Sequence, residues 1–446
     1  MTAAVPRVRN PLLSTLLTLR GNGRACVYTE PMWGLSMALV LPYASVFMLA
    51  LGLQDHQIGL LATISMLSQM VAGLLSGAIT DKFGRRLTTA VSDFIAFVIP
   101  CLVWAFAQNF WWFLVAAVIN GAWQVSQNSW DCLLVEDVDR KTIPKVYSLI
   151  KVAADLSALF APIAALMVSQ FGLVPAVRIL YLNAAFFMLV KLLVLYKFST
   201  ETRMGVIRRE QNRGVPLRKA LAGYGSVLRL IVHSRGTLFA LLISAIFSAV
   251  TLVNGTFWQV VVNKRLGVPD ALLPLFPMAR SILSLVLFFT VIHWLTSAHK
   301  LRWPTMWGFG VYLAGQVLLI LIPATDSATA STYLLLAGCL LLDAFGTGVL
   351  FMLSESLVAL HVDANERSRV MAIQRTVVML ATAPFGWISG ALSQVDRSYP
   401  FYLTSALLII GMIAVGWFWV TSHEPTGDEP EGDDVDADSG AELPAL

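Results

Sequence analysis

Amide and carboxylate side chains that could bind a small solute stand inside one long apolar block of the sequence. Asn120, Gln124 and Asn128 recur at every fourth position, and Asp131 follows three residues later. At 3.6 residues per turn, they form one stripe of a helix. Such a stripe must face protein or water, so it predicts the wall of a solute cavity or hydrogen bonds between helices. We interpret Asn120, Trp123, Gln124 and Asn128 as solute ligands, with helix–helix bonding as the alternative.

Two opposite charges lie near the middle of two later apolar blocks. A bare carboxylate at the depth of Asp343 costs several kcal/mol unless it is paired or protonated. We expect Arg280 to pair with Asp343 or with an anionic solute. Asp343 is then either a proton-coupling site, at which protonation and binding exclude each other, or part of a structural pair.

Further candidates come from other apolar blocks. Asn254, Trp258 and Thr347 are predicted solute ligands, and Trp33, Met37 and Tyr43 are weaker candidates because aromatic and Met side chains more often fill a core. Asp155 follows Lys151 by four residues, so the two can pair along one helix face, and Asp155 is the second proton-coupling candidate. Asp93 and Lys191 are interpreted as side chains that snorkel to the membrane surface.

The elements that must position these residues follow from composition. Of 446 residues, 57% are hydrophobic and 13% charged, and the mean hydropathy is +0.72, whereas about a quarter of a soluble protein is charged. Twelve separate blocks of about 20 residues suit helices that cross about 30 Å of hydrocarbon. The predicted class is an all-α integral membrane protein. The blocks begin near Pro31, Ile58, Leu87, Trp111, Lys145, Val177, Gly236, Ala271, Pro304, Ser331, Ala372 and Tyr399.

The distribution of positive charge predicts the orientation. Most of the 31 Lys and Arg fall in one set of loops, and only Arg178, Lys264, Arg265 and Arg397 fall in the other. Positive loops stay inside, so both termini are expected to be cytoplasmic at the cell membrane. The predicted division is an N-terminal cytoplasmic segment at 1–27, a six-helix bundle at 28–199, a cytoplasmic linker at 200–235, a second six-helix bundle at 236–422 and a disordered acidic tail at 423–446.

The two halves are related in sequence by a constant offset of 224 residues. Val138-Asp139, five residues and Lys145-Val146 match Val362-Asp363, five residues and Arg369-Val370. The same offset maps Asp131 onto Glu355 and Lys151 onto Arg375. It predicts two pseudo-symmetric bundles facing each other around a central site. The acids and bases near one end of this site are interpreted as gate salt bridges.

One turn carries the most specific pattern of the chain, the stretch Gly77-Ala78-Ile79-Thr80-Asp81-Lys82-Phe83-Gly84-Arg85-Arg86. It resembles the signature of the major facilitator superfamily, which is Gly, three residues, Asp, a base, any residue, Gly, Arg and a base. The resemblance implies two six-helix halves, alternating access and a turn that latches the cytoplasmic side. Gly77 is expected to permit close helix contact, Gly84 a tight turn, and Asp81 to face the N-terminus of a neighbouring helix. The predicted cytoplasmic gate comprises Gly77, Asp81, Lys82, Gly84, Arg85, Arg86, Asp131, Lys151, Glu355 and Arg375.

The predicted function is secondary active transport of a small organic solute by alternating access. Ala161-Pro162-Ile163-Ala164-Ala165 resembles the Gly-Pro-x-x-Gly-Gly stretch of drug and proton antiporters, with Ala wherever that pattern has Gly, which favours proton-coupled efflux. Alternatives are proton symport or facilitated diffusion of a sugar or organic anion, and a non-transporting sensor. The sequence carries no phosphate-binding loop, His-Glu-x-x-His or Cys-x-x-Cys, so we predict no enzyme, cofactor or metal. The predicted partners are the solute, a proton and the lipid bilayer, with no nucleic acid, and the chain is expected to be a monomer.

Overall fold

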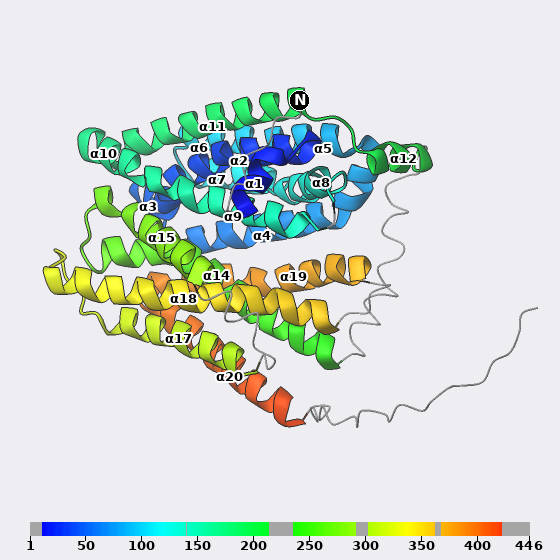
Figure 1. Cartoon of the computed structure of the whole chain (residues 1–446). Helices are drawn as coiled ribbons and strands as arrows, with labels where there is room; N and C mark the ends of the chain where they lie inside the picture. The colour runs from blue at the N-terminus through cyan, green and yellow to red at the C-terminus, as the bar shows by residue number, and fades with distance from the viewer. Residues whose placement is uncertain (1–10, 140, 214–234, 291–301, 362–366, 422–446) are drawn as a thin grey trace, which may run out of the picture.

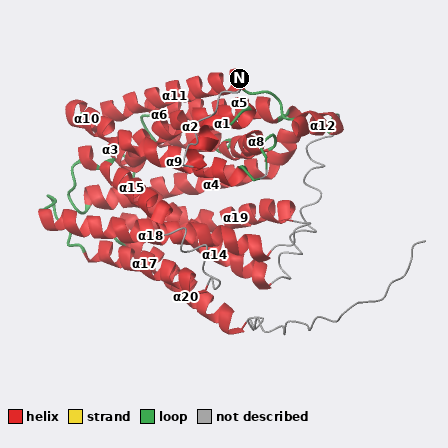
Figure 2. Ribbon diagram, viewed as in Figure 1, coloured by secondary structure: helices red, strands yellow, loops and turns green. Residues whose placement is uncertain are grey.

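The computed structural model describes residues 11–139, 141–213, 235–290, 302–361 and 367–421, and these residues form helices and short connections without a strand (Figure 2). Eleven of the described helices are long and apolar enough to cross a membrane. The twelfth crossing is the pair α7 and α8, which a turn at Gly121 divides. An added Cβ at Gly121 would lie 2.7 Å from Ser68 Cβ, so the break lets this helix approach α4 closely. The chain is therefore an all-α membrane protein with twelve spanning helices.

The first half contains six crossings, several of them in two pieces. Its pieces are α2 (Gly21–Val40) with α3 (Ala44–Ala50), α4 (Asp55–Phe83), α5 (Arg85–Asp93) with α6 (Ile99–Ala105), α7 (Phe110–Asn120) with α8 (Trp123–Val135), α9 (Ile143–Ser157) with α10 (Ala161–Phe171), and α11 (Leu173–Phe198). Pro42, Pro100 and Pro162 stand at these interruptions, because proline has no N–H to continue the helical ladder. The short helices α1 (Pro11–Thr18) and α12 (Arg203–Gln211) flank the half.

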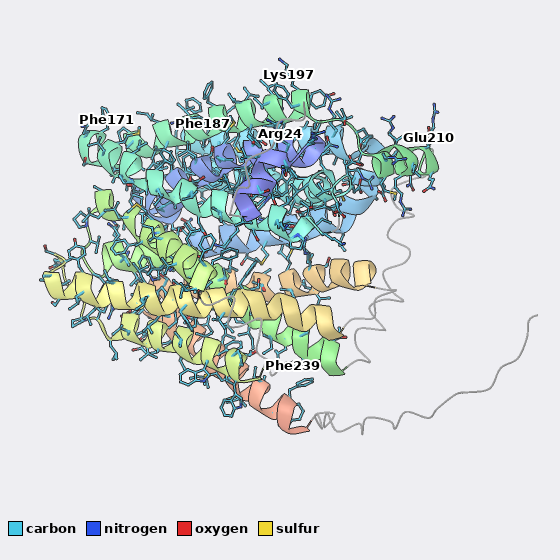
Figure 3. The ribbon with its side chains drawn as sticks, viewed as in Figure 1. Arg24, Phe171, Phe187, Lys197, Glu210 and Phe239 are labelled. Atoms are coloured by element: carbon cyan, nitrogen blue, oxygen red, sulfur yellow. The ribbon has the colours of Figure 1, made fainter. Side chains whose placement is uncertain are left out.

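The second half contains the other six crossings with fewer breaks. They are α14 (Arg235–Lys264), the 3-10 turn η5 (Asp270–Leu272) with α15 (Leu275–Thr290), α17 (Arg302–Leu321), α18 (Ala330–His361), α19 (Arg367–Val395) and α20 (Tyr399–Thr421). In Figure 1 the first half, blue to green, lies above the second half, green to red. Glu210 of α12 and Phe239 of α14 lie at one end of the molecule and Phe171 at the other (Figure 3). We call these the Gly84 end and the Asp55 end, after a residue at each.

The first crossing begins ten residues earlier than the sequence predicted. Its helix starts at Gly21 rather than near Pro31, because the polar residues of its first turns are buried inside the first half. Asn22 donates to Asp137 at 2.9 Å, and its oxygen accepts from the backbone of Thr200 at 2.8 Å. The remaining crossings match the predicted blocks. The boundaries predicted for the bundles, linker and tail remain predictions, and residues 214–234 and 422–446 lie outside the described part.

The halves meet tightly at the Asp55 end, where α4 packs on α19. Gly59 lies against Gly390, so that an added Cβ on Gly59 would come within 2.7 Å of the Gly390 Cα and closer still to the Gly386 carbonyl oxygen. Ser393 donates to Asp55 at 2.7 Å, and Arg397 lies 3.5 Å from the same carboxylate. Backbone contact and an ion pair between buried Asp55 and partly exposed Arg397 together join the halves at this end.

The glycine contact yields a first prediction. Gly59→Ala should lower the melting temperature of the purified protein, because the new methyl group overpacks two backbones at a cost of about 1–3 kcal/mol. Gly77→Ala is the matched control, since nothing lies within 4 Å of its added Cβ. That change should be neutral or stabilise by about 0.5–1 kcal/mol through helix propensity. Equal melting temperatures for the two variants would contradict the packing described here.

Candidate functional site

A cavity of about 440 Å³ lies between the two halves. Side chains of α2 and α9 line it from the first half, and side chains of α14, α15 and α18 line it from the second. Its wall is largely apolar, with Trp33 and Met37 on one side and Trp258 and Phe276 on the other. Arg280 is the charged residue among the described lining residues. A pocket of this size with apolar walls and a few polar groups suits a small organic molecule.

Arg280 and Asp343 form an ion pair, as the sequence predicted. The Arg280 guanidinium donates to the Asp343 carboxylate, and their side chains are 36% and 3% exposed. The guanidinium also lies 5.6 Å from the ring centre of Trp258, within range of a cation–π interaction. The Nε of Arg280 is buried and has no hydrogen-bond partner in the described part of the chain. The Arg280 side chain therefore faces the cavity, and the Asp343 carboxylate lies behind it.

A polar network supports the Asp343 carboxylate from behind. Gln316 donates to Asp343 at 3.4 Å and to Asn254 at 3.3 Å, and Asn254 donates to the Tyr312 hydroxyl at 3.2 Å. Thr404 donates to the Gln316 oxygen at 3.1 Å. Gln316, Tyr312 and Thr404 are buried and were not among the predicted site residues. Tyr312 and Gln316 share one helix face at a spacing of four, which is the signal that could have found them.

The structure brings only some of the predicted solute ligands together. Asn254, Trp258 and Arg280 line the cavity, as do Trp33 and Met37.

Two other predicted side chains lie outside the cavity lining. Thr347 lies close enough to the Tyr312 hydroxyl to interact with it, so it adjoins the network behind the cavity. Tyr43 is fully buried in the core of the first half.

The amide stripe of α7 and α8 holds helices together. Asn120 donates to the carbonyl of Ala96 at 2.9 Å, and Asn128 donates to Thr80 at 3.3 Å. Ala96 lies in a π-helical turn of the third crossing, Phe94–Val98.

Two neighbours of these amides make packing contacts. Gln124 packs on Gly73 of α4, and Trp123 meets the ring of Phe97 edge to face. Asn120, Trp123, Gln124 and Asn128 are not among the described residues that line the cavity. In this conformation they match the helix–helix alternative.

The turn after α4 is held by acids from two other segments. Gly84 has φ +88°, a conformation that glycine adopts without strain. Arg85 lies 2.9 Å from Asp81 and 3.1 Å from Glu136. Glu201 accepts from the backbone N–H groups of Arg85 at 2.8 Å and Arg86 at 3.2 Å. Glu201 therefore occupies the N-terminus of α5, and Asp81 pairs with Arg85. That Asp81 faces the N-terminus of another helix stays a prediction.

Other predicted gate residues have different surroundings from those expected. Gly77 makes no close helix contact, since nothing lies within 4 Å of an added Cβ. Arg86 stacks 4.0 Å from the ring centre of Tyr196, and Lys82 lies 6.0 Å from that of Phe83. Arg86 also donates from Nε to the carbonyl oxygen of Tyr196 at 3.1 Å.

The acids and bases predicted to pair at the gate are separated into different contacts. Lys151 pairs with Asp155 and also donates to Ser284 of the second half at 2.9 Å. Asp131 accepts from Gln127 at 3.2 Å.

The sequence offset relates Lys151 to Arg375 and Asp131 to Glu355. The charge of Arg375 acts on Asp131 through space. The side chain of Glu355 lies outside the described residues.

Lys191 and Asp93 do not snorkel, contrary to the sequence-based interpretation. The Lys191 ammonium donates to Asp93 at 3.1 Å, and their side chains are 5% and 3% exposed. Both charges are enclosed by the helices of the first half, so they stabilise each other away from lipid and water.

Comparison with known proteins identifies the family. The model of the Major Facilitator Superfamily matches residues 32–341 and 276–443 of this chain. The chain belongs to the Major Facilitator Superfamily. It is thus a multi-pass membrane transporter, in agreement with the two pseudo-symmetric halves. The residues of its transport site are not fixed by that membership.

Individual relatives are more distant. The chain is 32% identical over 87 residues to the quinolone resistance protein NorA of Staphylococcus aureus, covering 20% of this chain and 22% of that protein. The match thus spans about a fifth of the relative. Among solved structures, the nucleoside transporter NupG superposes with a TM-score of 0.68 at 10% identity, covering 90% of this facilitator and 99% of that chain. The human organic anion transporter MFSD10 gives 0.62 at 15% identity, covering 91% and 100%.

The ion pair between Arg280 and Asp343 yields a second prediction. Arg280→Gln should lower the melting temperature because it leaves the Asp343 carboxylate buried without its partner, a change that costs about 3–5 kcal/mol for fully buried pairs and less here, since Arg280 reaches the cavity. The double variant Arg280→Gln with Asp343→Asn should recover most of the loss. A double variant no more stable than Arg280→Gln would show that the pair does not determine the stability of this region.

Proposed function

We propose that the chain is a secondary transporter that carries a small amphiphilic organic anion together with a proton. The observation that supports this is the unequal exposure of the ion pair. The Arg280 side chain lines the cavity and is 36% exposed, whereas the Asp343 side chain is 3% exposed and enclosed behind it. A solute in the cavity would therefore touch the cation and not the anion.

The same arrangement provides a coupling mechanism. When an anionic group of the solute takes over the Arg280 guanidinium, Asp343 loses its counter-charge. An unpaired carboxylate at this depth is costly, so Asp343 takes up a proton. Solute binding and protonation then favour each other, as thermodynamic linkage requires. Anion and proton travel in the same direction, and an inward proton gradient drives uptake.

The apolar part of the solute fits the rest of the wall. Trp33 and Phe276 offer ring faces, and Met37 and Met278 offer polarizable thioethers that adapt to different shapes. The guanidinium would then select a carboxylate, sulfonate or phosphate group by paired N–H donors. Selectivity would rest on charge more than on the outline of the molecule.

Alternating access would use the contacts between the halves. In this conformation α4 and α19 are joined at the Asp55 end through Gly59, Gly390 and the ion pair of Asp55. We propose that rocking separates this contact and exposes the cavity to the other side. The Gly84 turn would latch the cytoplasmic side, with both termini in the cytoplasm at the cell membrane and the chain acting as a monomer.

A second candidate is proton-driven efflux. The partial likeness to NorA, named as a quinolone resistance protein, favours export. In that scheme a solute with a positive charge competes with the proton for Asp343, so proton and solute move in opposite directions. Arg280 would have to leave the carboxylate before such a solute could bind.

Transport into proteoliposomes tests the proposal. A thermal-shift screen of aromatic carboxylates and sulfonates first selects a ligand, which is then followed with an imposed inward proton gradient. The wild type should accumulate the anion and acidify the lumen. Asp343→Asn should abolish accumulation but keep exchange of solute across the membrane, since the coupling group alone is lost. Glu210→Gln, which changes an exposed carboxylate of α12, should retain gradient-driven accumulation.

Other results would count against the proposal. Full accumulation by Asp343→Asn would remove Asp343 from the coupling mechanism. Solute extrusion driven by proton entry would favour the efflux scheme, and anion movement that ignores the proton gradient would indicate facilitated diffusion.

A further inference from the structure

A second group of buried charges lies inside the first half, on α2, α5 and α11. Asp93 of α5 has two partners: Lys191 of α11 donates to one carboxylate oxygen at 3.1 Å, and Ser126 of α8 donates to the other. Lys191 also lies 6.0 Å from the ring centre of Trp130. Asp93 is thus fully supported by a cation and a hydroxyl.

Glu30 of α2 lies in the same enclosure without such support. The residue is 6% exposed, and no hydrogen bond or ion pair reaches its carboxylate from the residues that the structure describes. The indole N–H of Trp130, beside Lys191, is also buried and unpartnered there. In the described part of the chain, two polar groups of this enclosure therefore lack protein partners.

The surrounding charges do not neutralise Glu30. The charges that act on it are Lys191 of α11, Asp93 of α5 and Asp131 of α8. The Cys26 thiol on its own helix is also close enough to interact with it.

The other elements packed on α2 add no cation that acts on Glu30, since Lys191 is the cation among the charges that act on it. Lys145 of α9 is exposed in the first turn of that helix. From α9, Lys151 is paired with Asp155 and bonded to Ser284. The segments Leu41–Tyr43, Ala158–Phe160 and Ala161–Phe171 carry no charged side chain.

The Lys191 ammonium is thus the cation near several carboxylates, and it is paired with Asp93. A carboxylate left buried without a counter-charge costs several kcal/mol, and the usual outcome is that it binds a proton.

Glu30 lies near the cavity along its own helix. It stands one helical turn before Trp33 and Gly34, which line the cavity from α2. A change in the charge of Glu30 would therefore occur close to a bound solute.

We propose that Glu30 is a second proton-binding site, which shares Lys191 with Asp93. With Lys191 on Asp93, a proton from water is held on a Glu30 carboxylate oxygen. When the ammonium turns to Glu30, the proton returns to water and Glu30 becomes the charged partner. The existence of this site does not depend on the proposed function, whereas its role in coupling rests on it.

Infrared difference spectroscopy during a pH titration of the full chain in phosphatidylcholine vesicles tests the site. A protonated carboxyl group in water-poor surroundings gives a carbonyl stretch that charged carboxylates lack. The wild type should show such a band at neutral pH, and Glu30→Gln should lose it. Asp93→Asn should also lose it although Glu30 is retained, because the freed Lys191 then pairs with Glu30. Asp343→Asn, a change in the other half, should keep it.

The outcomes separate this site from the proposed function. A band that persists in Glu30→Gln, or in Asp93→Asn, overturns the proposal. If Glu30→Gln does not fold, Glu30→Asp should shift the band, and an unshifted band overturns the proposal as well. Loss of the band in both variants supports the site even if Asp343→Asn shows that Asp343 does not couple transport to protons.

Discussion

A charge inside an apolar helical bundle must find a partner, and the interior of this protein is organised by that constraint. Desolvation of a carboxylate in either half costs several kcal/mol unless the group is paired or protonated. Asp343 is paired with Arg280 and supported by an amide and hydroxyl network, and Asp93 is paired with Lys191 and a serine. The helices that supply these groups are thereby fixed against each other, and the cavity between the halves takes its polarity from one of the two pairs.

The two pairs differ in what else can reach them. Lys191 and Asp93 are both enclosed, so their partners can change only within the protein or by protonation. Arg280 is open to the cavity, so a solute can compete for it. An ion pair with one open member can convert the arrival of an external charge into a change in a buried one, and the proposed coupling rests on this difference. An enclosed pair can respond only to the movement of its helices.

The fold was predictable from the sequence because long apolar blocks leave the chain few alternatives in a membrane. The partnership of Arg280 with Asp343 was also predictable, since each would be costly alone at mid-depth. Burial inside a half was not predictable: Lys191 and Asp93 have the same sequence appearance as snorkelling residues, and Glu30 stood before the predicted start of its helix. The sequence likewise could not show which face of α7 and α8 the amides occupy. The spacing of the amides predicts that they share one helix face, but it does not show what that face contacts.

The contact between α4 and α19 has a consequence for how the molecule is made. His56 and Gln394 touch although 338 residues separate them, so this junction can form only after nearly the whole polypeptide has been synthesised and inserted. The ion pair of Lys191 with Asp93 and the Glu201 contact at the Gly84 turn lie within the first half, and they can be complete while the second half is still on the ribosome. Maturation should therefore proceed from one finished bundle to the next, with the glycine junction as the final step of assembly.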